Sequence, residues 1–388
     1  MSPLETRTVS ALALIYALRM FGLFMVLPVL ALYGSEYQGA SATLVGIAIG
    51  AYGLTQALLQ LPFGAWSDRI GRKPVILVGL ILFTLGSALA AMADDIWMLI
   101  LGRALQGAGA VASTLMALMT DLTREENRTK AMASIGASIG LSFTLAMVAG
   151  PILASWLGLS GLFALTAVLS VGAIVLLYTA VPTPSQQVRS RDARAFFHQL
   201  GDVVKDRQIL RISYGIFALH AVLVGCFVAV PAALHQSGMV LSDHWKVYLP
   251  VMISAFVVMV PFIIVAEKYK KMKWILTLAV GLLMVSVVWL AMGLESIEHL
   301  IMALWLFFLA FNILEASLPS LISKFAPPGF KGSAMGLYST SQFLGAFVGG
   351  FLGGYLTEHV SLAGVFWGLM PLLLVWFALV ATMAKPKH

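Results

Sequence analysis

Long apolar runs, separated by short polar breaks, make up almost the whole chain of 388 residues. A helix of about 20 apolar residues is long enough to cross the hydrocarbon core of a bilayer. The pattern contains twelve runs of this kind, and it predicts twelve transmembrane helices joined by short loops. The predicted spans cover residues 8–33, 42–64, 75–93, 96–119, 130–156, 161–181, 209–234, 246–266, 274–293, 299–322, 332–357 and 361–383.

The composition agrees with an all-α membrane protein. The chain is 60% hydrophobic and only 11% charged, whereas soluble domains are about 25% charged. So few charges could not cover the surface of a compact soluble domain, so the bilayer is the expected solvent. The first apolar run is too long for a cleaved signal peptide and is interpreted as the first span.

The distribution of basic residues predicts the topology. The chain carries 24 Lys and Arg against 17 Asp and Glu. With the N-terminus in the cytoplasm, all but three basic residues fall on cytoplasmic ends or loops; the exceptions are Lys246, Arg19 and Arg103. This asymmetry is typical of membrane proteins, and the basic loops are expected to contact anionic lipid. We therefore expect both termini in the cytoplasm and no nucleic-acid partner.

The longest polar stretch divides the spans into two sets of six. We expect an N-terminal six-helix bundle over residues 1–181, a cytoplasmic linker over 182–208 and a C-terminal six-helix bundle over 209–388. The linker is either flexible or contains a short helix on the membrane surface. Its apolar residues recur at helical spacing: Phe196, Phe197, Leu200, Val203 and Val204.

The two halves resemble internal repeats. A shift of 203 residues places Ala131-Met132 on Ala334-Met335 and Gly150 on Gly353. Two pseudo-symmetric bundles would leave a ligand site between them, near the midplane. Glycines at four-residue spacing, which let helix backbones approach closely, occur in two spans: Gly46 and Gly50, then Gly345, Gly349 and Gly353, with Gly350 and Gly354 beside them.

The loop after the second span has a distinctive order of residues. It reads Gly64-Ala65-Trp66-Ser67-Asp68-Arg69-Ile70-Gly71-Arg72-Lys73-Pro74. Gly64 and Gly71 would allow tight turns, and Asp68 could lie at the positive N-terminal end of another helix. The three basic residues could pair with acids, and Asp121 at the end of the fourth span is the nearest candidate. A loop that only sets topology would explain the positive charges but not Asp68 or the glycines.

This loop resembles the loop 2–3 motif of the major facilitator superfamily almost position for position. The resemblance implies two six-helix bundles and a gate, formed by Gly64, Asp68, Arg69, Gly71, Arg72, Lys73 and Asp121, that locks the outward-open arrangement. The fourth span contains Arg103-Ala104-Leu105-Gln106-Gly107, which is similar to the RxxQG motif that the family associates with proton coupling.

Further segments narrow the resemblance. Gly150-Pro151 stand where drug–proton antiporters of the family have a longer glycine-rich motif, although Ser142 and Ala146 replace two of its glycines. The segments 121–133, 243–249 and 318–324 look similar to YajR-type inner-membrane transporters. Proteins of that type often carry an extra soluble C-terminal domain, which is expected to be absent here because the sequence stops at His388. The resemblance implies a multi-pass protein of the bacterial inner membrane, which we expect to be a monomer.

Glu315 is the only ionisable residue in the apolar run 300–322. A charge at the centre of a membrane helix costs roughly 2.5 to 3.5 kcal/mol on insertion scales. The residue could bind a proton or a cationic substrate, or it could hold a neighbouring helix through a hydrogen bond. His220, in the seventh span, could exchange a proton with it, although a hydrogen bond in the core explains His220 equally well. Arg19 and Arg103 could balance the acid from the other half.

Several neutral polar residues within the spans could line a cavity. They are Tyr16, Gln106, Asn312, Tyr338 and Gln342. The sequence contains no G-x-x-x-x-G-K phosphate loop, no H-E-x-x-H helix and no cluster of metal ligands. We therefore expect neither an enzyme nor a metal site, and a proton gradient in place of a cofactor as the energy source.

Three functions remain open. The first is a proton-driven exporter of small amphipathic compounds that works by alternating access. The second is an importer, either proton-coupled or uniport, because the loop 2–3 motif is equally compatible with import. The third is a membrane sensor or scaffold without transport, which would not explain Asp68, Arg103 and Glu315 together.

Overall fold

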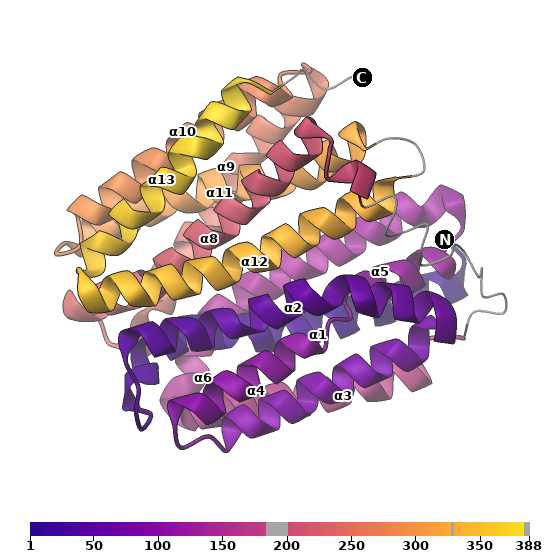
Figure 1. The fold of residues 1–388 in the computed structure, drawn as a ribbon, viewed down its shortest axis with the longest axis horizontal. Coiled ribbons are helices and arrows are strands. Elements are labelled where there is room, and N and C mark those ends of the chain that lie inside the picture. Colours follow the sequence, from indigo (N-terminus) through magenta and orange to yellow (C-terminus); the bar gives the residue numbers. More distant parts are fainter. Residues whose placement is uncertain (184–200, 327–329, 384–388) are drawn as a thin grey trace. The chain divides into compact units, whose positions relative to one another are not determined.

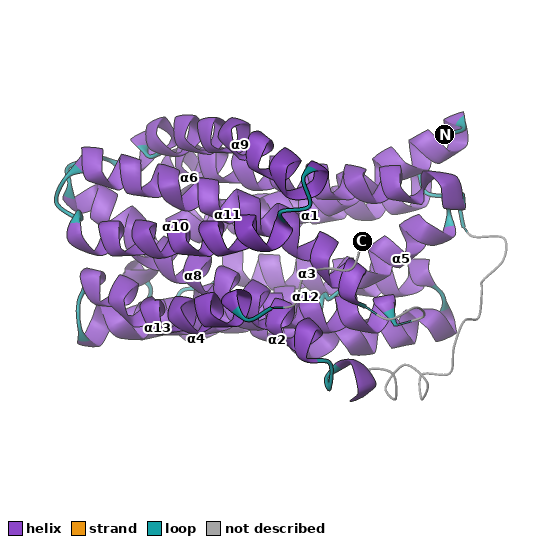
Figure 2. Cartoon of the chain, turned by 90° about the horizontal axis from the view of Figure 1, so that it is seen from above, coloured by secondary structure: helices purple, strands orange, loops and turns teal. Residues whose placement is uncertain are grey.

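The computed structural model describes residues 1–183, 201–326 and 330–383. These residues are almost entirely helical, and within them the only extended pairing is an isolated bridge between Gln38 and Asp95. Figure 2 shows helices joined by short loops. The fold class predicted from the apolar pattern is therefore confirmed.

Every predicted span coincides with helix. The helices are α1 Pro3–Tyr33, α2 Ala42–Ile70, α3 Arg72–Ala91, α4 Ile96–Ala108, α5 Ala112–Asp121, α6 Arg128–Thr179, α8 Arg207–Gln236, α9 Trp245–Lys268, α10 Met272–Met292, α11 Ile297–Phe325, α12 Lys331–His359 and α13 Leu362–Ala381. Helix α6 contains the predicted fifth and sixth spans, which meet at the non-helical Gly158. Ten segments of the described chain, with α6 counted as one, are long and apolar enough to cross a membrane.

Polar side chains set where several of these helices begin. The Ser2 hydroxyl accepts from the Glu5 amide while Glu5 accepts from the Ser2 amide, which forms a capping box at α1. Asp95, Asp206 and Ser361 cap α4, α8 and α13 through side-chain oxygens. Each cap satisfies amide groups that the first helical turn leaves unpaired.

The chain forms two compact units. Residues 1–40 and 51–193 make up the first, and residues 41–50 and 194–388 make up the second. In the first unit α1 packs against α6, and α3 packs against α4 and α6; in the second, α12 packs on α8, while α10 lies between α11 and α13 (Figure 1). The domain limits 1–181, 182–208 and 209–388 stay a prediction.

The predicted linker lies mostly outside the described residues. Positions 184–200, with Phe196, Phe197 and Leu200, are not described, whereas residues 201–203 are helical. The surface helix therefore stays a prediction, as does the cytoplasmic position of the two termini.

Helix α12 uses its glycines on two faces, both within the second unit. A Cβ atom at Gly345 or Gly349 would overlap the carbonyl oxygens of Phe217 and Ala221 on α8. On another face, a Cβ atom at Gly354 would overlap the carbonyl oxygen of Ala42 at the start of α2. The close helix approach predicted from the glycine spacing is thus confirmed.

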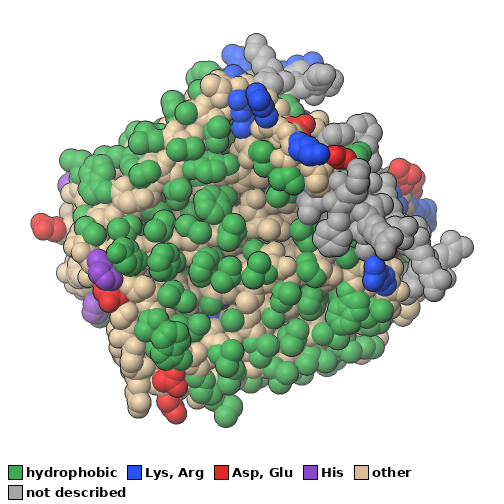
Figure 3. Space-filling model, viewed as in Figure 1, with side chains coloured by type: hydrophobic (Ala, Val, Ile, Leu, Met, Phe, Trp, Pro, Cys, Tyr) green, Lys and Arg blue, Asp and Glu red, His purple; other side chains and the backbone are tan. Residues whose placement is uncertain are grey.

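The surface is apolar where a soluble protein would be polar. Large hydrophobic side chains such as Trp156, Met292 and Val171 are exposed. Figure 3 shows hydrophobic side chains over most of the visible face, with charged side chains at its edges. Such a surface is stable in a bilayer, where lipid tails surround it.

Candidate functional site

An ion-pair cluster occupies the turn between α2 and α3. Arg72, at the start of α3, forms an ion pair with Asp68 in the last turn of α2. Its Nε atom lies 3.1 Å from Asp121 Oδ2 at the end of α5, and its Nη1 donates to Ser67 Oγ at 2.7 Å. One guanidinium group therefore joins three helices, and the pairing with Asp121 expected from the sequence is present.

The other two basic residues of this loop do not pair with Asp121. Lys73 Nζ donates to the carbonyl oxygen of Val181 at 2.7 Å and lies 5.5 Å from the centre of the Tyr178 ring. Arg69 is exposed and makes no ion pair with a described residue. Because adjacent residues of a helix point about 100° apart, Arg69 does not share the direction of Asp68. The expectation that all three cations pair with acids is correct for Arg72 alone.

The two glycines of the motif have different roles. Gly71 joins α2 to α3 with φ of 104°, a conformation that L side chains rarely adopt. Gly64 lies within α2, which continues to Ile70, and a Cβ atom there would lie 3.6 Å from Ser113 Oγ. The turn predicted at Gly64 is therefore wrong, because the helix extends beyond the apolar run that marked the span.

Arg19 lies at the centre of a buried polar network in the first unit. Its side chain is 1% exposed, and Nη2 donates to Gln56 Oε1 at 2.8 Å, to the Gly109 carbonyl at 3.0 Å and to the Tyr52 hydroxyl at 3.1 Å. Its guanidinium also lies 5.4 Å from the Phe83 ring centre. These acceptors and π faces offset part of the cost of burying a cation.

The fourth predicted span is broken in the structure. Helix α4 ends at Ala108 and α5 begins at Ala112, so the expectation of one continuous span is wrong. The end of a helix leaves carbonyl groups unpaired and carries partial negative charge. The Arg19 guanidinium binds one of these groups, the Gly109 carbonyl. The break thus supplies an acceptor for a buried arginine.

Arg103 and Gln106 of the RxxQG motif bind one another. Arg103 Nη1 donates to Gln106 Oε1 at 2.7 Å, and Gln106 Nε2 donates to Ser87 Oγ on α3 at 2.8 Å. The Arg103 guanidinium lies 5.6 Å from the Tyr52 ring centre, and that of Arg19 lies 5.8 Å from the same centre. Tyr52 therefore links the two buried arginines.

Sequence reasoning missed four members of this network: Tyr52, Gln56, Gln60 and Ser87. The amide of Gln56 donates to Gln60 Oε1 at 3.0 Å. The first three recur every four residues along the second span, and this polar stripe on one helix face was the available signal. Tyr16 is buried on α1 and lies three residues before Arg19, on the same face.

Gly150-Pro151 lies within α6, where that helix packs on α1. A Cβ atom at Gly150 would overlap the carbonyl oxygen of Met25. The glycine therefore permits contact between the backbones of two helices in the first unit, and Pro151 follows inside the same helix.

His220 and Gln342 contact one another in the second unit. Gln342 Nε2 lies 2.8 Å from His220 Nε2, and His220 Nδ1 lies 3.3 Å from the Ile216 carbonyl oxygen. A neutral imidazole satisfies both contacts, since it accepts at Nε2 and donates from Nδ1. The ring also packs against Phe311 of α11, with ring centres 6.1 Å apart. Two residues predicted separately thus form one pair.

Glu315 lies on α11 without a partner for one of its oxygens. Its Oε2 atom is buried and accepts no hydrogen bond within the described part of the chain. The Tyr338 hydroxyl on α12 is buried without a partner there too, and the two side chains interact electrostatically. Asn312 is half-buried three residues before Glu315, on the same helix face.

The predicted site residues therefore divide between the units. Arg19 and Arg103 belong to the first, and Glu315 and His220 belong to the second. The expected balance between the arginines and the acid stays a prediction. Within the described residues, no group of three or more His, Cys, Asp and Glu side chains could hold a metal ion.

Comparison with known proteins places these features in a family. The model of the Major Facilitator Superfamily matches residues 12–350, with a second match over 273–388. The chain is 49% identical over 388 residues to the inner membrane transport protein YajR of Escherichia coli (strain K12), which covers 100% of this chain and 86% of YajR. It is 29% identical over 366 residues to the multidrug resistance protein MdtH of Aeromonas hydrophila subsp. hydrophila, with 92% and 89% covered. The fold matches a crystal structure of a D-xylose-proton symporter with a TM-score of 0.79 at 15% identity, covering 98% of both chains.

Proposed function

We propose that this chain, which belongs to the major facilitator superfamily, is a proton-driven exporter of small amphipathic compounds that works by alternating access. Members of this family are membrane transporters and not enzymes, and the similarity to YajR supports a multi-pass protein of the inner membrane. We further propose that the transporter acts as a monomer, needs no cofactor beyond the proton gradient and has no nucleic-acid partner.

The observation that carries the proposal is the unpartnered carboxyl of Glu315. Its Oε2 atom is buried and has no hydrogen-bond partner among the described residues. A negative charge in such surroundings is costly, and a proton removes the charge. Access of water or approach of a cation would favour the ionised form again. Glu315 is therefore suited to take up a proton in one state and release it in another.

Coupling follows if the two states of the transporter differ in proton affinity, because a proton gradient then favours one state. Arg19 and Arg103 are the cations that the sequence offers for the ionised form of Glu315. His220 and Gln342 would bind substrate or relay the proton, and Tyr338 and Asn312 would supply neutral hydrogen bonds near the carboxyl.

The direction of transport rests on relatives and on composition. MdtH, which resembles this chain along most of its length, is a multidrug resistance protein. The buried ionisable residues are few among many apolar side chains, which suits an amphipathic compound better than a sugar. We propose that the cluster at Arg72 biases the exchange between the outward-open and inward-open states.

Proton movement in liposomes tests the proposal. The purified protein is reconstituted with a pH-sensitive dye in the lumen, and a panel of amphipathic cations, amphipathic anions and sugars is added outside. An antiporter moves protons against the direction of the added compound, which makes the lumen more acidic when protons leave it in the opposite sense in control vesicles of inverted gradient. Movement of protons together with a sugar would identify an importer instead. Absence of proton movement with every compound, despite measured binding, would contradict proton coupling.

A further inference from the structure

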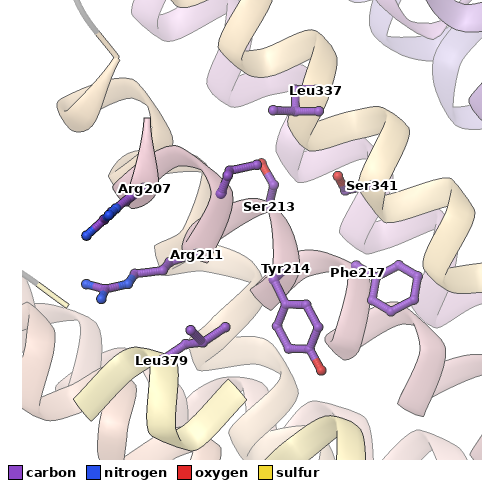
Figure 4. A pocket seen from close by; sticks show the side chains of 9 residues that line it. Arg207, Arg211, Ser213, Tyr214, Phe217, Leu337, Ser341 and Leu379 are labelled. Carbon is purple, nitrogen blue, oxygen red and sulfur yellow. The ribbon is translucent and has the colours of Figure 1, made fainter. Parts of the chain in front are cut away.

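A cavity of about 590 Å³ lies in the second unit, apart from Glu315 and His220. The first three turns of α8, the N-terminal half of α12 and the end of α13 form its walls (Figure 4). The residues that determine its chemistry are Arg207, Arg211, Tyr214, Phe217, Leu337 and Leu379.

Two arginines provide positive charge at one end of this groove. Arg207 and Arg211 are one helical turn apart, and Figure 4 shows both guanidinium groups extending from the same side of α8. Arg211 Nη1 donates to the Thr382 carbonyl at 2.8 Å, which holds this guanidinium at the end of α13. The residues lining the groove include no acid, and the adjacent Asp206 is engaged as the cap of α8.

The rest of the groove is apolar and has the depth of one lipid leaflet. From Arg207 to Phe217 α8 rises by about 15 Å, which is half of the hydrocarbon core of about 30 Å. Arg207 is the first residue of a helix long enough to span the membrane, so the charged end lies at the level of the lipid headgroups. The side chains of Tyr214, Phe217 and Leu337 then follow the depth of the acyl chains.

We propose that this groove binds one anionic phospholipid. Arg207 and Arg211 would bind the headgroup phosphate, since guanidinium groups form paired hydrogen bonds with phosphate, and one acyl chain would lie along Tyr214, Phe217 and Leu337. A zwitterionic lipid fills the same space but lacks the net negative charge that two cations favour. Free phosphate would engage the arginines and leave the apolar wall uncovered.

Native mass spectrometry of the full chain tests this inference. The protein is delipidated in detergent and titrated with phosphatidylglycerol, and the fraction carrying one lipid is measured. Each cation near an anionic headgroup contributes roughly fivefold in affinity, so Arg207→Gln with Arg211→Gln should weaken binding by roughly 25-fold. The matched control is Lys268→Gln with Lys271→Gln, which removes two exposed cations from the turn between α9 and α10 and should leave binding unchanged.

A second variant tests the apolar wall without changing charge. Leu337→Trp should fill the groove and abolish binding of the phospholipid while both arginines remain. The inference fails if either groove variant retains phosphatidylglycerol as wild type does, or if the lysine control loses as much as the arginine variant. Equal affinity for phosphatidylethanolamine would show that charge does not select the lipid, and displacement by inorganic phosphate from wild type and Leu337→Trp alike would identify an anion site in place of a lipid site.

Discussion

The Nε atom of Arg72 lies 3.1 Å from Asp121 Oδ2, so a single side chain ties the start of α3 to the end of α5. The same guanidinium binds Asp68 at the end of α2. The Arg72 and Asp68 side chains are 18% and 34% exposed, and partly exposed pairs contribute only about 0 to 1 kcal/mol. That amount is small against the stability of a bundle, but it is enough to bias two nearly balanced states of a transporter.

We expect Asp68→Asn to impair transport and to leave membrane insertion intact. The change weakens the bond to Arg72 and should shift the equilibrium towards the inward-open state by up to about fivefold, which corresponds to about 1 kcal/mol. Transport in liposomes and labelling of introduced cavity cysteines measure the two effects. Cys226 is the only native cysteine, so it would first be replaced by alanine.

Asp243→Asn is the matched control for this change. It removes an exposed carboxylate whose Oδ1 lies 2.9 Å from Lys246 Nζ, outside the loop 2–3 cluster. Transport and labelling should be unchanged. If Asp68→Asn behaves like this control in both assays, Asp68 has no part in a gate.

Glu315→Gln should abolish substrate-induced proton flux while substrate binding remains. The amide keeps the shape of the side chain but does not titrate, so the proposed proton site is lost. Flux is measured in liposomes from mildly acidic to mildly alkaline pH. Glu298→Gln is the control at the start of the same helix, where the carboxylate is exposed and accepts from the Ser296 hydroxyl at 2.8 Å. Equal flux in wild type and Glu315→Gln would assign Glu315 a structural role and leave His220 as the next candidate.

Gly150→Ala should destabilise the first unit by about 1 to 3 kcal/mol, the usual cost of overpacking. The added methyl group would overlap the Met25 carbonyl and force α6 away from α1. Thermal unfolding in detergent measures the loss. Gly140→Ala, on the same helix with no atom within 4 Å of the added Cβ, is the control and should unfold at or above the wild-type temperature. Equal unfolding temperatures in the two variants would contradict close packing at Gly150.

Glu358→Gln should make the second unit less sensitive to acid. Glu358 lies beyond the predicted span 332–357 and accepts from the Thr43 amide at 2.7 Å. Hydrogen bonding to Thr43, and secondarily to Ser41, lowers the pKa of Glu358 from 4.5 to about 2. A lowered pKa in the folded state means that the contribution to stability is complete above pH 4.5 and is lost as the pH falls towards about 2.

The unfolding temperature of wild type and of Glu358→Gln, compared between neutral pH and pH 2, measures this contribution. The difference between the two proteins should be largest above pH 4.5 and should disappear in acid. Glu36→Gln, which removes an exposed carboxylate in the short helix Gly34–Glu36, is the control and should show no such dependence. A difference that does not change with pH would exclude the proposed cap.

The sequence by itself determined the class of the protein and the position of its spans. Helix length in a bilayer depends only on the number of consecutive apolar residues, so a local pattern predicts it. The loop 2–3 motif was equally local, because Asp68 and Arg72 are four residues apart and meet at the turn that Gly71 forms. Glu315 was visible for the same reason, as one acid within an apolar run.

Only the tertiary structure decided which polar groups meet inside the bundles. Arg19 binds Tyr52 and the Gly109 carbonyl, which are 33 and 90 residues away, and the break between α4 and α5 that exposes this carbonyl has no apolar interruption to mark it. His220 likewise meets Gln342 across 122 residues. In a membrane interior without water, each buried polar group takes the partner that helix packing brings within reach. That partner depends on the geometry of two or three helices together, which no single stretch of sequence contains.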